Sequence, residues 1–399
     1  MKSIRYNPLA ALLLFFISPI LSIPLVLKGI CSCKKSAFFL FSLFLGLIAF
    51  TSIPFADLFR HTLHYYSYEG LTISEVIQIS DSDFLVPLIT SLFINNHIPY
   101  EYFRLSQITI GFYLLCLIFR SMINGSPVAY SNKDIFYRFC ILFLLFDLLI
   151  TISGVRFGFS VILFVCGVHL FIKEKKLSAA CIFIIAALVH ISMSFFIPLF
   201  LILFKVKPSL KKAIILFIFL SFLMPFIYDS FSFLLGKRLD WYFEDGINTK
   251  KGYKDATIIG LALTIGKYLF LIPIISSILT YKDHNKWKYA TITWLTIACI
   301  FISNKSLFGR SLFVLQSTIC FTILSIEQYG KLKQKKIQLF ILCALIVTSF
   351  NTINMFKSYI YPSKYENLFL PIPYILQDTY EKNWILNHID NNEYIKEVK

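Results

Sequence analysis

Two arginines stand where apolar, helix-length runs begin. Arg156 follows Gly154 at the head of one run, and Arg310 follows Gly309 at the head of another. The first turn of a helix has free amide donors and a partial positive charge, and a guanidinium fork placed there matches a phosphate or diphosphate. Both positions therefore predict a site for a phosphorylated ligand. The competing interpretation is an arginine near a span end that only reaches toward the membrane interface.

One histidine interrupts a further apolar stretch. His190 lies between Val189 and Ile191. An imidazole ionises near neutral pH and can act as a general base or a hydrogen-bond donor, and polar groups inside membrane segments favour functional cavities. We predict that His190 acts with Arg156 and Arg310 in catalysis, against the alternative that it is a packed polar residue.

Two polar, aromatic segments have a composition that suits sugar binding. The first extends from Asp57 to Phe84 and contains Arg60, His61, His64, Tyr65, Tyr66, Tyr68, Glu69, Asp81 and Asp83. The second surrounds Arg238 and Trp241. Aromatic faces stack on apolar sugar faces, and carboxylates accept hydrogen bonds from hydroxyls, although an interfacial aromatic belt has the same composition. The predicted substrate-binding residues are Asp57, Arg60, Tyr65, Arg238 and Trp241.

Two further charged residues, Asp147 and Lys267, lie inside apolar runs. A charge in a membrane span is costly unless it has a partner. The simplest interpretation is an ion pair within the helix bundle, either direct or through an arginine. A catalytic base at Asp147 is the alternative.

The composition identifies the environment in which these residues must be positioned. The 399 residues are 57% hydrophobic with 43 Phe, only 15% are charged, and the mean hydropathy is +0.72, which excludes a soluble domain. The apolar runs are continuous rather than alternating, which excludes an outer-membrane barrel. A run of about 20 apolar residues crosses a hydrocarbon core as a helix. We predict an all-α polytopic integral membrane protein with about 11–12 transmembrane or re-entrant helices and outer-face loops.

The apolar runs predict one transmembrane domain over residues 1–356 and a polar C-terminal tail over 357–399 on the outer side. The first run, 9–29, is expected to be one retained helix kinked at its prolines, and the short run 84–94 to be interfacial or re-entrant. The other predicted spans are 37–56, 102–119, 135–152, 154–172, 213–228, 257–280, 289–303, 308–326 and 337–356.

The run 177–204 is too long for one span. As a single helix it would measure about 42 Å, yet lysines flank both of its ends. Because cytoplasmic loops carry the excess of Lys and Arg, both ends belong on the inner side and the run must fold into a hairpin near His190. The same rule, with 20 Lys and Arg in the loops assigned to the inside against 12 in the others, predicts that Arg156, His190 and Arg310 face outward.

Several function classes are excluded or disfavoured. The formal charge of +16 comes from lysines in short loops, which orientation explains, so no nucleic-acid partner is expected. Seven of the nine cysteines lie in apolar runs, where a thiol acts as a small hydrophobe. No Walker loop, zinc-ligand pair or nucleophile elbow is present. We therefore expect no cofactor and no metal, and an activated substrate that supplies its own free energy.

The chain resembles the Wzy/EpsG-type polysaccharide polymerases of bacterial envelopes. The resemblance is carried by the Asp57–Tyr68 loop, the Arg156 helix followed by Lys173–Lys176, the stretch Ala187–Ser192, and the late helix at Gly309 and Arg310. Gly167, eleven residues after Arg156, matches an arginine-to-glycine spacing of some such polymerases. The equivalent position after Arg310 is occupied by Phe321, which departs from that pattern.

The resemblance implies a multi-pass glycosyltransferase of the bacterial inner membrane with its active site facing the periplasm. Such an enzyme joins undecaprenyl-diphosphate-linked oligosaccharide repeat units into O-antigen or capsular polysaccharide at the outer leaflet. Arg156 and Arg310 would hold diphosphates, and His190 would assist the acceptor hydroxyl or the leaving group. The implied partners are the lipid-linked oligosaccharide, membrane lipids and a candidate chain-length regulator protein.

Two alternatives to this function stay open. A flippase for the same lipid-linked unit would have two similar halves and charges through the bundle centre, and no convincing repeat is found. An O-antigen ligase would have one dominant outer loop, whereas the outer polar sequence here is divided among several segments.

Overall fold

The computed structural model describes residues 6–55, 57–80, 83–126, 129–206, 285–301, 305–327 and 362–389, with single residues at 215, 346, 349, 353 and 360. The regular secondary structure in these ranges is helical, which confirms the all-α prediction. The predicted span 257–280, most of 213–228 and 337–356, and the residues Arg238, Trp241 and Lys267 lie outside the described residues.

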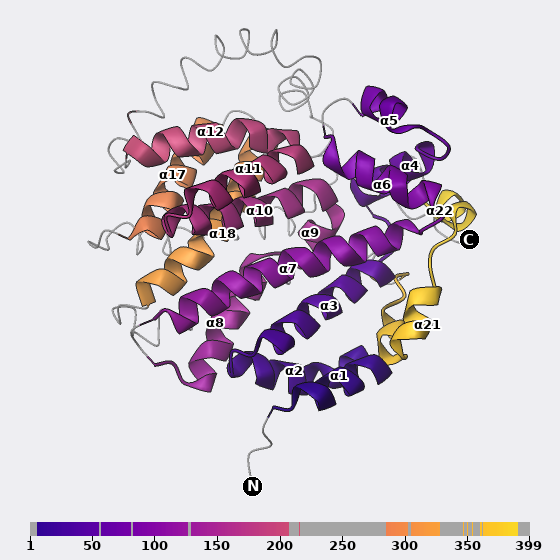
Figure 1. Cartoon of the computed structure of the whole chain (residues 1–399), viewed down its shortest axis with the longest axis horizontal. Coiled ribbons are helices and arrows are strands. Elements are labelled where there is room, and N and C mark those ends of the chain that lie inside the picture. Colours follow the sequence, from indigo (N-terminus) through magenta and orange to yellow (C-terminus); the bar gives the residue numbers. More distant parts are fainter. Residues whose placement is uncertain are drawn as a thin grey trace, which may run out of the picture.

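Figure 1 shows the helices as one bundle, with a group of short helices at one end. The helices are α1 Pro8–Ile17, α2 Pro19–Cys31, α3 Lys35–Thr51, α4 Asp57–Ser67, α5 Ile73–Ile79, α6 Leu85–Asn95, α7 Tyr100–Asn124, α8 Asn132–Leu145, α9 Leu148–Ser153, α10 Val155–Ile172, α11 Lys176–Val189, α12 Ile191–Val206, α17 Lys286–Ile300, α18 Lys305–Glu327, the 3₁₀ helix η3 Tyr365–Phe369, α21 Ile372–Gln377 and α22 Lys382–His388.

Three described stretches are long and apolar enough to cross a membrane, namely Tyr100–Asn124, Val155–Ile172 and Leu307–Ser325. Six shorter apolar helices accompany them, among them α1, α3 and α11. Several large apolar side chains on the outside of the bundle, such as Leu9, Leu13 and Leu177, are exposed. Apolar surface of this kind suits contact with lipid tails, and the protein is polytopic in the membrane.

Two predicted single helices are divided in the structure. The run 9–29 forms α1 and α2 with a break at Ser18, whose backbone is extended (φ −158°, ψ 109°), because Pro19 has no N–H and suits a helix start. The run 135–152 divides into α8 and α9, where the carboxylate of Asp147 accepts from the Ile150 amide at 3.2 Å and caps α9. Asp147 therefore begins α9, directly after Phe146, the C-cap of α8.

The Asp57–Tyr68 segment was predicted as a loop, and this was wrong because it forms α4. Two contacts of Asp57 one turn apart, its ion pair with Arg60 and its polar contact with His61, support this helix despite its low overall hydrophobicity. The next helix, α5, begins with a capping box in which Thr72 and Glu75 exchange hydrogen bonds. The short helix predicted at 84–94 is present as α6.

The hairpin predicted at His190 is confirmed by ring contacts along α10. Phe157 at the start of α10 contacts His190, Phe164 in the middle contacts Phe183 and Phe200, and Phe171 at the end contacts Phe204. The chain therefore rises along α11, turns at His190 and returns along α12. A Cβ on Gly167 would lie 2.5 Å from the Phe183 ring, so this glycine allows the close approach of α10 and α11.

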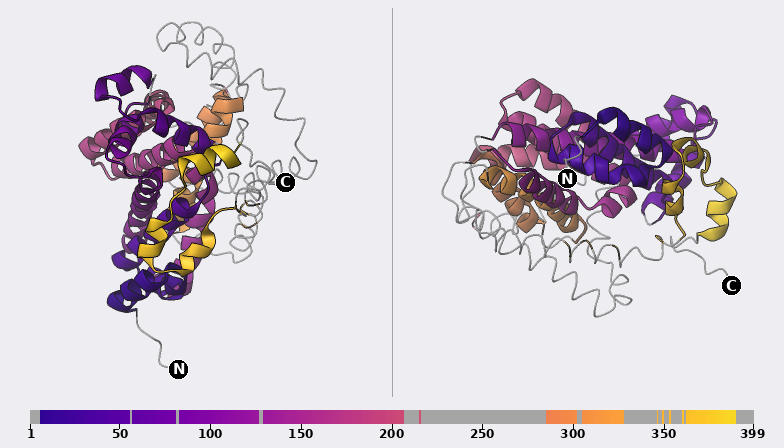
Figure 2. Two further views of the ribbon diagram at one scale, coloured as in Figure 1. Left: turned by 90° about the vertical axis from the view of Figure 1, so that its right-hand side faces the viewer. Right: turned by 90° about the horizontal axis from the view of Figure 1, so that it is seen from below.

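The described part of the C-terminal tail packs on the end of α3. The Lys364 amide and the Tyr380 hydroxyl both donate to the Thr51 carbonyl, at 3.0 and 2.9 Å, and the Tyr102 hydroxyl donates to the Leu376 carbonyl at 2.7 Å. Figure 2 shows this segment, in yellow, along the side of the bundle near α1 and α3. The tail lies at the end of α3 that leads into α4, and the side of the membrane that this end faces stays a prediction.

Candidate functional site

Arg156 is the second residue of α10, and its side chain leaves the helix at the end that carries α4 and α6. Its guanidinium Nη1 lies 2.8 Å from the Asp83 carboxylate. The Arg156 side chain is 22% exposed, whereas Asp83 is only 3% exposed. A Cβ on Gly158 would lie 2.9 Å from the Thr151 backbone, so α9 packs closely against α10 and fixes this helix start.

Asp83 connects three parts of the fold. It lies just before α6, and while one carboxylate oxygen pairs with Arg156, the other accepts from the Ile191 amide at 2.7 Å. Ile191 is the first residue of α12, directly after the break at His190. The buried carboxylate therefore fixes the arginine relative to the tip of the hairpin.

His61, on α4, contacts the same guanidinium. Arg156 Nε donates to His61 Nε2 at 3.2 Å, and the same imidazole nitrogen lies 3.1 Å from Asp57 Oδ2. The other Asp57 oxygen pairs with Arg60 at 2.9 Å. Helical spacing of three and four residues places Asp57, Arg60 and His61 on one face. The result is a continuous network from Arg60 through Asp57, His61 and Arg156 to Asp83.

The network sets the protonation states on α4. Burial acts to raise the pKa of Asp57. In the acidic range where Asp57 titrates, however, the charge and hydrogen bond of a protonated His61, with Arg60 and Arg156, hold that pKa well below its usual range. Burial and then the Arg156 charge lower the pKa of His61, against the opposing effect of Asp57 and Asp83. At neutral pH, Asp57 is an anion and His61 is a neutral imidazole.

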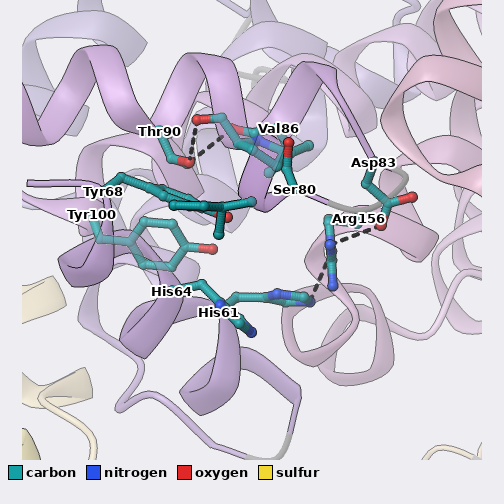
Figure 3. A pocket seen from close by; sticks show the side chains of 11 residues that line it. His61, His64, Tyr68, Ser80, Asp83, Val86, Thr90, Tyr100 and Arg156 are labelled. Carbon is teal, nitrogen blue, oxygen red and sulfur yellow. Dashed lines mark hydrogen bonds and ion pairs between the residues drawn. The ribbon is translucent and has the colours of Figure 1, made fainter. Parts of the chain in front are cut away.

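Of this network, His61, Asp83 and Arg156 line a cavity of about 100 Å³ between α4, α5, α6, α7 and α10. In Figure 3, His61 and Arg156 point toward each other on one side, and Tyr68 and Tyr100 lie on the other. The lining residues are His61, His64, Tyr68, Ile79, Ser80, Asp83, Val86, Pro87, Thr90, Tyr100 and Arg156. The cavity thus has a cation, a carboxylate, two imidazoles, phenols and hydroxyls around a space of a few water molecules' size.

Arg310 and His190 do not line this cavity, but both contact Phe157. The prediction that Arg310 begins its helix was wrong, because Arg310 is the sixth residue of α18. The Arg310 guanidinium carbon is 5.4 Å from the centre of the Phe157 ring, and the His190 ring packs edge-on against the same ring at 5.3 Å. Phe157 follows Arg156 in the chain. Arg310 and His190 therefore meet at Phe157, the chain neighbour of Arg156, and of the three residues predicted to be catalytic only Arg156 lines the cavity.

His190 is buried, and the hydrogen bonds of its ring are to the nearby Ser192. Its Nδ1 lies 2.7 Å from the Ser192 hydroxyl and 3.2 Å from the Ser192 amide, which donates to it. These bonds hold the ring at the turn between α11 and α12. Its chemical role stays a prediction.

Among the predicted substrate-binding residues, Asp57 and Arg60 belong to the Arg156 network. Tyr65 is buried instead, where its hydroxyl donates to the Ile98 carbonyl at 2.5 Å and its ring packs on Tyr66 and Tyr100. Arg238 and Trp241 lie outside the described residues.

Apart from Arg156, none of the residues that line the cavity was predicted as a site residue from the sequence, and those missed include His61, Tyr68, Asp83 and Tyr100. The spacing of Asp57 and His61 by one helical turn could have identified the histidine had α4 been recognised. Asp83 has no comparable local signal, because its amide partner lies 108 residues further along the chain. Within the described ranges, no group of three His, Cys, Asp or Glu side chains could hold a metal ion.

Comparison with protein families gives one match. The EpsG family matches residues 34–374, which is most of the chain and includes the residues that line the cavity. Searches of curated proteins and of solved structures gave no match. The extent of the match, on a polytopic helical membrane protein, shows that the chain belongs to the EpsG family.

Proposed function

We propose that this protein polymerises undecaprenyl-diphosphate-linked oligosaccharide repeat units at the outer leaflet of the inner membrane. Membership of the EpsG family supports a polysaccharide-polymerase-like role. The observation that carries the proposal is the cavity in which the Arg156 guanidinium stands beside a neutral imidazole and a buried carboxylate. In the proposed reaction, a growing glycan leaves one lipid diphosphate and joins the terminal sugar of another.

Arg156 is suited to hold the diphosphate of the donor. Its contacts with Asp83 and His61 use Nη1 and Nε, and Nη2 carries two further donors. The side chain is partly exposed at the start of α10, where the helix dipole adds positive potential. The cavity of about 100 Å³ matches one phosphate group or one edge of a sugar, so the polyprenyl and glycan chains would extend beyond it.

A second cation is needed because donor and acceptor both carry a diphosphate. Arg310 lies on the Phe157 ring next to Arg156, and we assign the acceptor diphosphate to it. The Phe157 ring would hold the Arg310 guanidinium in place while the sugars meet. His190, on the same ring, would orient the acceptor side.

Deletion of the gene in its host distinguishes this function from its alternatives. A polymerase deletion leaves surface glycan with one repeat unit per lipid core. Absence of surface glycan, with lipid-linked units retained on the inner side, would favour a flippase and reject the proposal. Long polymer retained on the carrier lipid would favour a ligase and also reject it.

A reconstituted assay tests the proposal directly. Purified protein in liposomes, supplied only with the lipid-linked repeat unit, is expected to form a ladder of longer lipid-linked glycans and to release undecaprenyl diphosphate. Failure to extend the unit by protein that is folded and correctly oriented would contradict a polymerase.

A further inference from the structure

One nitrogen atom in the cavity faces two groups with opposite requirements. His61 Nε2 lies 3.2 Å from Arg156 Nε, which can only donate, and 3.1 Å from Asp57 Oδ2, which as a carboxylate can only accept. Without a proton, Nε2 accepts from Arg156. With a proton, Nε2 donates to Asp57 and has nothing to offer Arg156. The position of Arg156 and the protonation of His61 are therefore coupled.

In the arrangement seen in the structure, the unprotonated state of His61 Nε2 is favoured. The Arg156 guanidinium stands beside the ring, and His61 is buried, so a second positive charge there is costly. Asp57 does not depend on a proton from His61, because its other oxygen has Arg60 at 2.9 Å. His61 is thus held as a neutral acceptor whose basicity is suppressed by its neighbour.

A bound diphosphate would remove that suppression. A dianionic ligand attracts the guanidinium far more strongly than a neutral imidazole does. As Arg156 turns its donors to the ligand, Nε2 loses both its hydrogen-bond donor and the nearby positive charge. A proton taken up at Nε2 is then stabilised by Asp57 Oδ2, at 3.1 Å on the other side.

We propose that His61 is the catalytic base of this site and that Arg156 activates it by turning to the donor diphosphate. The proposal rests on the proposed function and deepens it. The acceptor hydroxyl gives its proton to His61 Nε2 while its oxygen bonds to the anomeric carbon of the donor sugar. The bond from that carbon to the phosphate oxygen breaks, and its electron pair leaves with undecaprenyl diphosphate on Arg156. His61 returns the proton to water as the products depart.

His61 is buried among several groups that can carry charge or titrate, and any pH dependence must be assigned among them. Those that share its helix, line its cavity or belong to its network are Asp57, Arg60, His64, Tyr65, Tyr66, Tyr68, Asp83, Tyr100 and Arg156. His64 is the other imidazole among them. An acid limb in the pH profile of the rate therefore belongs to His61 only if it is absent in His61→Gln and still present in His64→Gln.

The test uses full-length protein in liposomes with the lipid-linked repeat unit, and the variant His61→Gln. Glutamine can still accept from Arg156 and donate to Asp57, but it cannot take a proton. We expect the polymerisation rate to fall on the order of 10²–10⁴-fold, with the KM for the donor unchanged. The wild-type rate should show an acid limb as His61 is protonated, and the residual His61→Gln rate should lack this limb.

His97→Asn serves as the control, because His97 is exposed outside the cavity and asparagine tolerates its left-handed backbone (φ 57°). This control should keep the wild-type rate and profile. A rate within threefold of wild type for His61→Gln, an acid limb that persists in it, or a loss that lies in KM alone would overturn the inference. If His61→Gln does not accumulate as folded protein, Asp57→Asn should reduce the rate and shift the limb, and an unchanged profile there would also overturn it.

The outcomes for the base and for the proposed function are separable. If His61→Gln is fully active while Arg156→Ala forms no polymer, only the base assignment fails. If wild-type protein forms no polymer at all, the proposed function fails first.

Discussion

Two arginines near the same end of the bundle, Arg104 and Arg156, have opposite surroundings. Arg104 on α7 is 1% exposed, and it donates to the Ser52 and Phe50 carbonyls at 2.9 and 3.3 Å. Its ion pair with Glu101 spans 3.5 Å. Those carbonyls are at the C-terminal end of α3, where backbone acceptors have no helical partner. Arg104 therefore ties α7 to the end of α3.

Arg156 has side-chain partners and a cavity instead. Its contacts are the Asp83 carboxylate and the His61 imidazole, and it is 22% exposed. Backbone carbonyls cannot leave a buried arginine without unfolding a helix end, whereas side-chain partners can be exchanged for a ligand. The comparison of Arg104 with Arg156 indicates that an arginine near a helix start can bind a ligand only where the ligand can replace its partners.

The largest expected effect is on activity at Arg156. Arg156→Ala should reduce polymerisation on the order of 10²–10³-fold because the developing diphosphate charge loses its clamp. Arg156→Lys should recover only part of the rate, since an ammonium group lacks the fork. Glycan chain length and rate in liposomes are the measurements, with protein amount as the control. Polymer of wild-type length from either variant would show that Arg156 does not hold the diphosphate and is structural, like Arg104.

At Arg104 the effect should be on stability. Arg104→Ala leaves Glu101 and the α3 carbonyls buried without their donor, which costs about 3–5 kcal/mol. We expect less folded protein and a lower unfolding temperature, but an unchanged rate per folded molecule. If Arg104→Ala is as stable as wild type but polymerises more slowly, Arg104 serves activity rather than stability.

Asp83→Asn should have a smaller effect on activity. Asparagine keeps an oxygen for the Ile191 amide but removes the charge that orients Arg156. We expect a decrease of about tenfold in rate, from the usual value of 1–3 kcal/mol for a charge-assisted bond. The rate of the variant relative to its folded amount measures this. Equal loss of protein and activity would make Asp83 purely structural.

Acid should lower the stability of the protein through His61, which belongs to the Arg156 site. The pKa of His61 is lowered on folding, so the unfolded chain takes up its proton first, and stability falls as the pH drops below about 6.5. The pKa of Asp57 is also lowered, so its contribution is present above about pH 3.9 and is lost only as pH falls further. Thermal unfolding between pH 5 and 8 should show the His61 effect in wild type and lose it in His61→Gln.

The smallest effect is expected at an exposed ion pair. Lys286 lies 2.9 Å from Glu174, but the two side chains are 50% and 76% exposed. Glu174→Gln should barely change the unfolding temperature and leave polymerisation unchanged, because solvent screens an exposed ion pair. Thermal unfolding measures this reference value. A change as large as that of Arg104→Ala would show that charge alone, without burial, governs these sites.

The sequence determined the membrane class, most helices and the turn at His190. Continuous apolar runs leave the backbone no partner in lipid except its own, so they must be helical. Lysines at both ends of 177–204 could not cross the membrane, so the run had to fold back, and the ring contacts along α10 confirm it. The sequence also selected Arg156 and, through family resemblance, the EpsG type.

Only the tertiary structure decided which polar groups meet. Asp83, the Arg156 guanidinium and the Ile191 amide come from distant parts of the chain, and their contact depends on how each helix is rotated about its axis. Nearly uniform apolar helices encode little about that rotation, because many faces can be buried equally well. Specific breaks at Ser18, Asp147 and His190, and close packing at Gly158 and Gly167, fix it instead. The same packing gave Arg104 permanent backbone partners and left Arg156 beside a cavity.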